Sequence, residues 1–224
     1  QERVVRLLES QLDSTIPGAA DTPAELRVVF LQEVSSSMAD FFRFVSANRE
    51  PPWYWSFSAG CERPPQGDSC AANTAIVSTQ WLDSIADLCV NFDQPKGARR
   101  GGRVRRYAAA TYKQSLILVS VHVLHEPIGT GEGPHNGAVS EAALRSRFDG
   151  LLRQGYVVVA AGDYNCKVEL GAARITDELA VVRAQPDEPT QLRMNGESEA
   201  VDGVMVYFDD SQASVQLTEV HVRP

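Results

Sequence analysis

The sequence predicts a sandwich of the α/β or α+β class built around one compact core. Short apolar runs bounded by turn residues, which are typical of strands, outnumber the segments with helical spacing. No unit of about 20–50 residues recurs along the chain, which excludes repeat architectures. A chain of 224 residues suits one large domain, so we expect residues 1–224 to form a single domain.

Three segments are expected to be helical. Apolar residues recur at helical spacing from Arg3 to Leu12, and Met38 to Val45 has a similar pattern. The segment SEAALRSRFDGLLRQG is the third, with Ser140 as a candidate N-cap and Gly155 as a candidate C-cap. These few helices are expected to cover the strands.

The remaining apolar runs are expected to be strands, with a helical or mixed pattern only at Ala172–Val182. The turn Lys113-Gln114 is expected to join two of the strands in a hairpin. The expected strands are Leu26–Leu31, PPWYWSFSAG (as strand or ordered loop), ANTAIVS, LDSIADLCVNF, RYAAATY, SLILVSVHVL, YVVVAAGDYN, VDGVMVYF and SVQLTEVHV.

Composition excludes several classes of protein. Hydrophobic residues at 43% and charged residues at 22% are ordinary for a globular chain and exclude collagenous and generally disordered classes. No run of about 18 apolar residues exists, so no membrane span is expected. The first residues, QERVVRLLESQL, include acidic residues and lack the apolar segment of a secretory signal peptide, so no such signal is expected in them. The net charge of −8 argues against wrapping nucleic acid by bulk charge.

Charge is nevertheless spread unevenly. The stretch from Gln94 to Lys113 holds seven basic residues and no acid, whereas Ala161 to the end has twelve acids against five bases. A basic loop facing an acidic half suits a metal site that receives a phosphate-bearing ligand. A solvated loop in an acidic protein is the alternative.

The four cysteines include no C-x-x-C pair, so a zinc site is not expected. Cys61 and Cys70 bracket the loop ERPPQGDS, where either a disulfide or two free thiols would fit.

Polar residues with metal- and phosphate-binding chemistry follow three of the expected strands. Glu33 follows the strand 26–31, His122 and His125 end SLILVSVHVL, and Asp163 and Asn165 follow YVVVA. Such carboxylate, amide and imidazole groups are what an oxygen-preferring cation and a phosphate would use. Taken singly, Glu33 could instead be a cap or ion-pair partner, Gly-Asp-x-Asn a turn, and each histidine structural.

Five segments in order resemble the endonuclease/exonuclease/phosphatase superfamily, the DNase I-like proteins. They are LQE at 31–33, NTAIVS at 73–78, VSVHV at 119–123, GDYN at 162–165 and VDGVMV at 201–206. The resemblance implies a four-layer αββα fold, a two-sheet β-sandwich flanked by helices, with the site at one end of the sheets.

The resemblance also implies the central site residues. Glu33 would ligate Mg²⁺ or Mn²⁺, and Asp163 would orient or deprotonate the attacking water. Asn165 would hold a phosphate oxygen, and His122 would hydrogen-bond the scissile phosphate.

Further residues are implied at the periphery of that site. Arg106, expected to open the strand before the histidine strand, matches an arginine that contacts the phosphate backbone. Arg103 and Arg105 are not matched to the superfamily, but as part of the basic run beside Arg106 they are expected to bind substrate. Asp202 matches the aspartate that orients a terminal catalytic histidine. Asn73 would support the site or contact phosphate.

The sequence departs from this superfamily's pattern at both ends. The first motif-bearing segment, T-W-N, and the last, S-D-H, are lacking, and His221 in TEVHVRP is given no catalytic role. The chain is expected to be a fragment, one half of a split domain, or a retired enzyme. Since missing outer strands would expose sheet edges, flanking sequence or a protein partner is expected to cover them.

The predicted function is a Mg²⁺-dependent phosphodiesterase, most simply a nuclease acting on nucleic acid. A catalytically retired or split domain serving as an interaction subunit is the alternative from a different class. A phosphomonoesterase or lipid phosphatase is the alternative within the fold. The segment QPDEPTQLRM stands where inositol phosphatases carry P-x-W-C-D-R, which counts against phosphoinositides.

Overall fold

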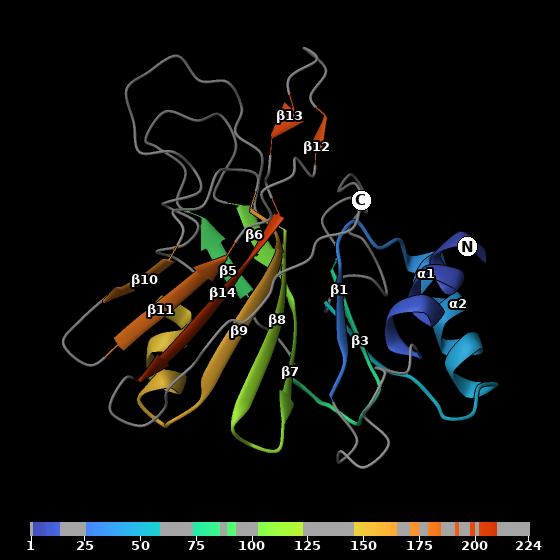
Figure 1. The fold of residues 1–224 in the computed structure, drawn as a ribbon, viewed down its shortest axis with the longest axis horizontal. Helices are drawn as coiled ribbons and strands as arrows, with labels where there is room; N and C mark the ends of the chain where they lie inside the picture. The colour runs from blue at the N-terminus through green and yellow to red at the C-terminus, as the bar shows by residue number, and fades with distance from the viewer. Residues whose placement is uncertain are drawn as a thin grey trace.

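The computed structural model of the chain shows two β-sheets packed against each other, with helices on the outer faces (Figure 1). It describes residues 2–13, 26–58, 74–85, 89–92, 103–122, 146–164, 171–174, 179–184, 191–192, 198–199 and 202–209.

The helices form where the sequence predicts them. Helix α1 spans Glu2–Leu12 and α2 spans Ser36–Ala47, where the Ser35 side chain accepts a hydrogen bond from the Met38 backbone N–H at 3.3 Å. Residues 146–152 are also helical. This helix ends at Gly155, whose φ of 84° is the left-handed conformation expected of a C-cap glycine.

Among the described residues, ten strands form two main sheets, and four further strands form two short ribbons. The strands are β1 Val28–Leu31, β2 Tyr54–Phe57, β3 Ala75–Ser78, β4 Asp83–Ile85, β5 Cys89–Phe92, β6 Arg103–Arg106, β7 Ala108–Tyr112, β8 Leu116–His122, β9 Val157–Asp163, β10 Gly171–Arg174, β11 Leu179–Ala184, β12 Gln191–Leu192, β13 Ser198–Glu199 and β14 Asp202–Asp209.

The larger sheet has the order β10-β11-β14-β9-β8-β7-β4. Its pairs are antiparallel except for β8 and β9, which are parallel. Because β8 and β9 are parallel, their carboxyl ends meet at one edge of the sheet, the upper edge in Figure 1. Lys113 and Gln114, with φ near +50°, turn β7 into β8 at the opposite end, which confirms the predicted hairpin.

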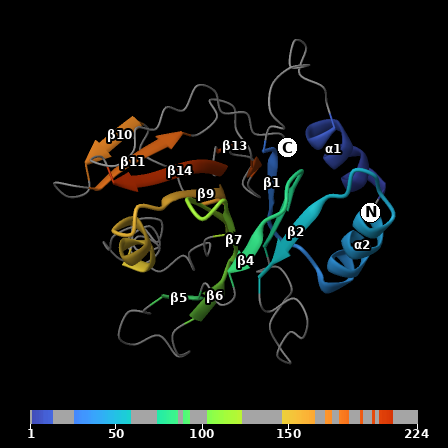
Figure 2. The ribbon, with the colours of Figure 1, turned by 90° about the horizontal axis from the view of Figure 1, so that it is seen from below.

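The smaller sheet is antiparallel, with the order β1-β3-β2. Side chains alternate along its strands, so Phe30 and Ile76 face the larger sheet whereas Leu31 and Val77 face the helices. In Figure 2, α1 and α2 cover the outer face of this sheet.

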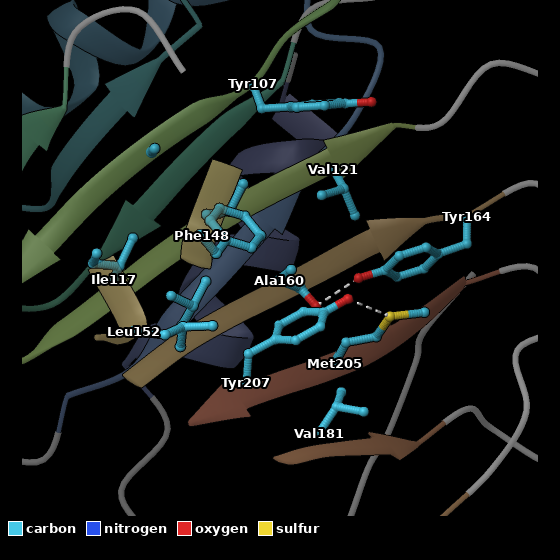
Figure 3. Close-up of a cluster of buried hydrophobic side chains, with 13 residues drawn as sticks. Tyr107, Ile117, Val121, Phe148, Leu152, Ala160, Tyr164, Val181, Met205 and Tyr207 are labelled. Carbon is cyan, nitrogen blue, oxygen red and sulfur yellow. Dashed lines mark hydrogen bonds between the residues drawn. The ribbon is translucent and has the colours of Figure 1, made fainter. Parts of the chain in front are cut away.

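Three apolar clusters join the layers. Leu8 of α1 and Phe42 of α2 pack on the smaller sheet, and Leu118 and Ile76 meet between the two sheets. On the far side of the larger sheet, the helix 146–152 packs through Phe148 and Leu152 (Figure 3). The order helix, sheet, sheet, helix confirms the predicted four-layer sandwich.

Two expectations about single segments are wrong. The segment LDSIADLCVNF is not one strand, because β4 pairs with β7 in the larger sheet whereas β5 pairs with β6 in a separate ribbon. The segment Ala172–Val182 is expected to have a helical or mixed pattern, but its described residues belong to two antiparallel strands, β10 and β11. Pairing of β11 with the long strand β14 decides this, since alternation puts Val181 into the core.

Several predictions concern residues outside the described ranges and stay predictions. They are the state of Cys61 and Cys70, the Ser140 cap and the strand SVQLTEVHV. No helix in the described part of the chain has the length and hydropathy needed to cross a membrane.

Candidate active site at one end of the sandwich

Three of the predicted site residues lie side by side on neighbouring strands of the larger sheet. Asp163 at the end of β9 is the register partner of His122 on β8 and of Asp202 on β14. Residues directly opposite one another on paired strands project from the same face of a sheet. Alternation from Leu118, which packs between the sheets, puts this row on the face toward the smaller sheet.

The imidazole and the carboxylate of this row are close to each other. His122 Nε2 lies 3.8 Å from Asp163 Oδ2, which is an ion pair when the imidazole is protonated and is longer than a direct hydrogen bond. The His122 side chain is 11% exposed and that of Asp163 is 20% exposed. Both can therefore be reached from solvent while the strands behind them stay buried.

Buried tyrosines support the backbone around these two residues. Tyr164 turns to the opposite face of the sheet, where its hydroxyl donates to the Ala160 carbonyl at 2.9 Å (Figure 3). Tyr107 donates its hydroxyl to the His122 carbonyl at 3.4 Å. Both tyrosines are buried, so the chain is anchored directly after Asp163 and at His122 itself.

Glu33 is brought to the same end of the molecule by the carboxyl end of β1. Ser120 Oγ donates to the Leu31 carbonyl at 3.0 Å, and Gln32 Nε2 donates to Ser120 Oγ at 3.2 Å. The smaller sheet thus meets β8 two residues before His122. Glu33 is the next residue after Gln32 and is exposed. Its backbone φ is 56°, and only a few per cent of non-glycine residues have a positive φ.

Gly162 makes this approach of the two sheets possible. A Cβ at Gly162 would lie 2.6 Å from Gln32 Nε2 and 2.2 Å from the Val121 carbonyl oxygen, and its φ is +141°. A side chain at this position would collide with both groups. The glycine of the sequence GDYN is therefore explained by the packing of Gln32 over it.

The arginine expected to open the strand before the histidine strand is placed differently. Arg106 ends β6, which pairs with β5, and β7 begins two residues later at Ala108. Ala108 is the register partner of Ser120, so the backbone of Arg106 reaches the same end as His122. Arg103 and Arg105 lie in the same short ribbon.

Two predicted site residues lie outside the described ranges. Asn165 comes directly after Tyr164, and Asn73 directly precedes Thr74. Thr74 is itself at the site end, because its hydroxyl accepts a hydrogen bond from the Ala108 backbone N–H at 2.8 Å. His125 is also outside the described part of the chain.

Sequence reasoning did not single out Gln32, Ser120 or Tyr107. A signal existed for Ser120, since it is a hydroxyl in the otherwise apolar run LILVSVHV. Polar residues inside a strand that is buried on both faces require hydrogen-bond partners, and here the partners belong to the other sheet. That pairing cannot be read from spacing along the chain.

The side-chain chemistry at this end fits a hard divalent cation. Among the described residues, no three His, Cys, Asp or Glu side chains converge as a metal cluster. Mg²⁺ is often held by only one or two carboxylates, with water and substrate phosphate completing its shell. Glu33 and Asp163 supply such carboxylates at one end of the sandwich, so the donor set is compatible with Mg²⁺ or Mn²⁺.

Comparison with known proteins gives structural neighbours. The chain matches no protein-family model and no curated protein sequence. Truncated TDP2 of Caenorhabditis elegans is similar, with 13% identity and a TM-score of 0.48 over 81% of this chain and 70% of that one. The Haemophilus ducreyi cytolethal distending toxin has 16% identity and a TM-score of 0.42 over 87% of this chain and 64% of that one.

A third neighbour is D. rerio TDP2 in complex with a single-strand DNA product. It has 12% identity and a TM-score of 0.44, and covers 95% of this chain and 78% of that one. The four-layer fold of this chain is established by its own strand pairing and core, and its structural neighbours include TDP2 and a cytolethal distending toxin.

Proposed function

We propose that this chain carries a divalent-metal-dependent phosphodiesterase site that acts on nucleic acid. The observation that supports this most directly is the row Asp202, Asp163 and His122, in register on three adjacent strands. Glu33 reaches the same end from the other sheet. Acidic oxygens and an imidazole are thus gathered at one end of the sandwich.

The opposed carboxylates favour a cation. Asp163 and Asp202 are register partners, and like charges directly opposite each other on paired strands destabilise the pair. A divalent cation at this end would remove that cost. Glu33 would hold the ion, which when bound would polarise a phosphate oxygen and favour ionisation of a water.

The remaining chemistry falls to the protein's own groups. Asp163 would orient the attacking water and accept its proton, while His122 Nε2 would donate a hydrogen bond to the phosphate as negative charge develops. At 3.8 Å from each other, the Nε2 atom of His122 and the Oδ2 atom of Asp163 are close enough to contact the same oxygen. Asp202 would hold the row in place, and Asn165 would bind a second phosphate oxygen.

Nucleic acid is the proposed substrate because of the basic run before Tyr107. Arg103, Arg105 and Arg106 occur in the ribbon that leads directly to Tyr107, which contacts the His122 carbonyl. With a net charge of −8 overall, attraction of a polyanion has to be local. Asn73 and this ribbon would bind the phosphate backbone.

The test is a cleavage assay of the chain on supercoiled plasmid and single-stranded RNA, in Mg²⁺, Mn²⁺ or EDTA. We expect metal-dependent cleavage that Asp163→Ala abolishes. Asp40→Ala, on the exposed surface of α2, serves as the matched control and should cleave like the wild type. A phosphomonoester substrate in parallel tests the phosphatase alternative.

Each result decides between the alternatives. Cleavage that persists in Asp163→Ala would come from a contaminating nuclease and would contradict the proposal. Metal binding without cleavage would support a split enzyme that needs a partner chain. Absence of both would support the interaction-subunit alternative.

A further inference from the structure

The two sheets are joined at the site end by buried hydrogen bonds that involve side chains. Ser120 Oγ donates to the Leu31 carbonyl at 3.0 Å, Ser56 Oγ donates to the Ala109 carbonyl at 3.3 Å, and Thr74 Oγ1 accepts from the Ala108 N–H at 2.8 Å. These hydroxyl residues are at most 4% exposed. Facing sheets usually lie about 10 Å apart and meet through apolar side chains, so these bonds mark a close approach.

A second polar group extends the bond made by Ser120. Gln32 Nε2 donates to Ser120 Oγ at 3.2 Å, while the same hydroxyl donates to the Leu31 carbonyl. The Gln32 amide also occupies the space over Gly162 that a side chain would need. Gln32 therefore contacts β8 at Ser120, two residues before His122, and β9 at Gly162, directly before Asp163.

The consequence concerns Glu33, the next residue along the chain. Glu33 and Asp163 belong to different sheets, and no hydrogen-bonded strand ladder fixes their separation in the described part of the chain. The contacts of Leu31 and Gln32 with Ser120 and Gly162 hold the carboxyl end of β1 against β8 and β9, in addition to the apolar packing of Phe30 between the sheets. Glu33 is moreover held at a φ of 56°, a conformation that persists only where the surroundings impose it.

We infer that Gln32 and Ser120 are positioning residues that set the place of Glu33 relative to Asp163, and thereby the affinity of the site for a divalent cation. Neither side chain contacts substrate in this scheme, and both act through Glu33. The inference rests on the proposed function, since it assigns these residues to the same cation site. Partners that orient metal ligands typically change metal affinity by about 10–100-fold.

The test uses variants of the whole chain and measures Mn²⁺ binding by electron paramagnetic resonance of the free ion. Ser120→Thr and Ser120→Val form an isosteric pair that differs in the hydroxyl, so any crowding is common to both. We expect Ser120→Val to bind Mn²⁺ at least about tenfold more weakly than Ser120→Thr. Gln32→Met, which keeps cover over Gly162 but lacks the amide donor, should show a similar loss.

Ser56→Ala is the matched control for loosening of the sandwich. Ser56 makes the same kind of buried hydroxyl-to-carbonyl bond between the sheets, but it joins β2, which β3 separates from β1, to Ala109 of β7. We expect Ser56→Ala to lower the melting temperature and leave the Mn²⁺ affinity unchanged. A Ser56→Ala loss equal to that of Ser120→Val would overturn the inference, because sheet contact in general would then be responsible.

A kinetic readout distinguishes positioning from simple destabilisation. In Ser120→Val and Gln32→Met, the Mn²⁺ concentration needed for half-maximal cleavage should rise by the same factor as the dissociation constant, with most of kcat recovered at saturating metal. If the wild type binds Mn²⁺ and all of these variants bind it equally well, the positioning inference is wrong and the proposed function stands. If the wild type and Asp163→Asn alike bind no Mn²⁺, the proposed function fails and the inference fails with it.

Discussion

Asp163 and Asp202 are directly opposite each other on the paired strands β9 and β14, so both carboxylates project from the same face of the sheet. A divalent cation should be attracted by the pair more strongly than by either group alone. We therefore expect Mg²⁺ to raise the melting temperature of the wild type, by an amount that grows with the ratio of metal concentration to dissociation constant. Asp163→Asn and Asp202→Asn should each shrink that rise, with about tenfold weaker binding, in thermal denaturation with Mg²⁺ and with EDTA.

Asp149→Asn is a suitable control for this comparison. Asp149 lies in the helix 146–152 on the far side of the larger sheet, and removing its charge should leave the response to Mg²⁺ intact. An equal response in wild type, Asp163→Asn and Asp202→Asn would show that the two carboxylates do not attract the ion.

Gly162 tolerates no side chain, because a Cβ would meet the Val121 carbonyl oxygen at 2.2 Å. Gly162→Ala should therefore destabilise the protein by about 1–3 kcal/mol, the cost of forcing such a backbone conformation and contact. For a chain of this size that is a fall of roughly 2–4 °C in melting temperature per kcal/mol. Gly150→Ala is the opposite case, because nothing lies within 4 Å of the added Cβ in a helix. Gly150→Ala should therefore raise the free energy of unfolding by about 0.5–1 kcal/mol. A neutral Gly162→Ala would contradict the close approach of Gln32 and Val121.

Glu33 occupies the left-handed region with φ at 56°, where glycine is favoured over alanine by about 1 kcal/mol. Glu33→Gly should consequently be more stable than Glu33→Ala in chemical denaturation, and both should lose the stabilisation by Mg²⁺. Lys113→Gly is the control, since Lys113 has a φ of 51° in the hairpin turn at the opposite end. Lys113→Gly should raise the free energy of unfolding and keep the stabilisation by Mg²⁺. Equal Mg²⁺ stabilisation in wild type and Glu33→Ala would remove Glu33 from the cation site.

The basic ribbon is tested by the salt dependence of nucleic-acid binding. If Arg103, Arg105 and Arg106 bind phosphates, replacing all three with glutamine should make the slope of log K against log salt less negative by about 2, because each neutralised phosphate of a single strand contributes about 0.7. Fluorescence anisotropy of a labelled single strand over a salt series, with EDTA to prevent cleavage, measures this slope. Arg153→Gln provides the comparison, because Arg153 is exposed beyond the end of the helix 146–152 and before β9 begins. An unchanged slope in the triple variant would exclude the ribbon from the interface.

Local sequence was sufficient for most elements and failed where pairing partners decide. The hairpin at Lys113-Gln114 and the cap at Gly155 were predictable because both depend on residues a few positions apart. The segment Ala172–Val182 was not, because its strand β11 is selected by the neighbouring strand β14. In the same way, Arg106 could not be assigned to β6 before its partner β5 was known.

The candidate site likewise contains residues that local sequence predicted and residues that it could not predict. Glu33, His122 and Asp163 were predictable as polar residues that end apolar strands, and the resemblance of five motifs added Asp202. Their roles in catalysis stay predictions, as do those of Asn73 and Asn165 outside the described residues. Gln32 and Ser120 could not be assigned, because their hydrogen bond joins residues 88 positions apart in different sheets.

By itself, the sequence determined most of the strands and helices, and which chemical groups stand at several strand ends, because alternation, capping and turn preferences act over a few residues. Only the tertiary structure decided that Asp202, Asp163 and His122 form one row, and that Glu33 comes to the same end from the other sheet. Strand register and the contact between sheets depend on partners distant in the sequence. The register and the contacts are selected because one apolar face of each sheet has to be buried and every buried polar group has to be hydrogen-bonded. Only the folded chain satisfies both conditions together.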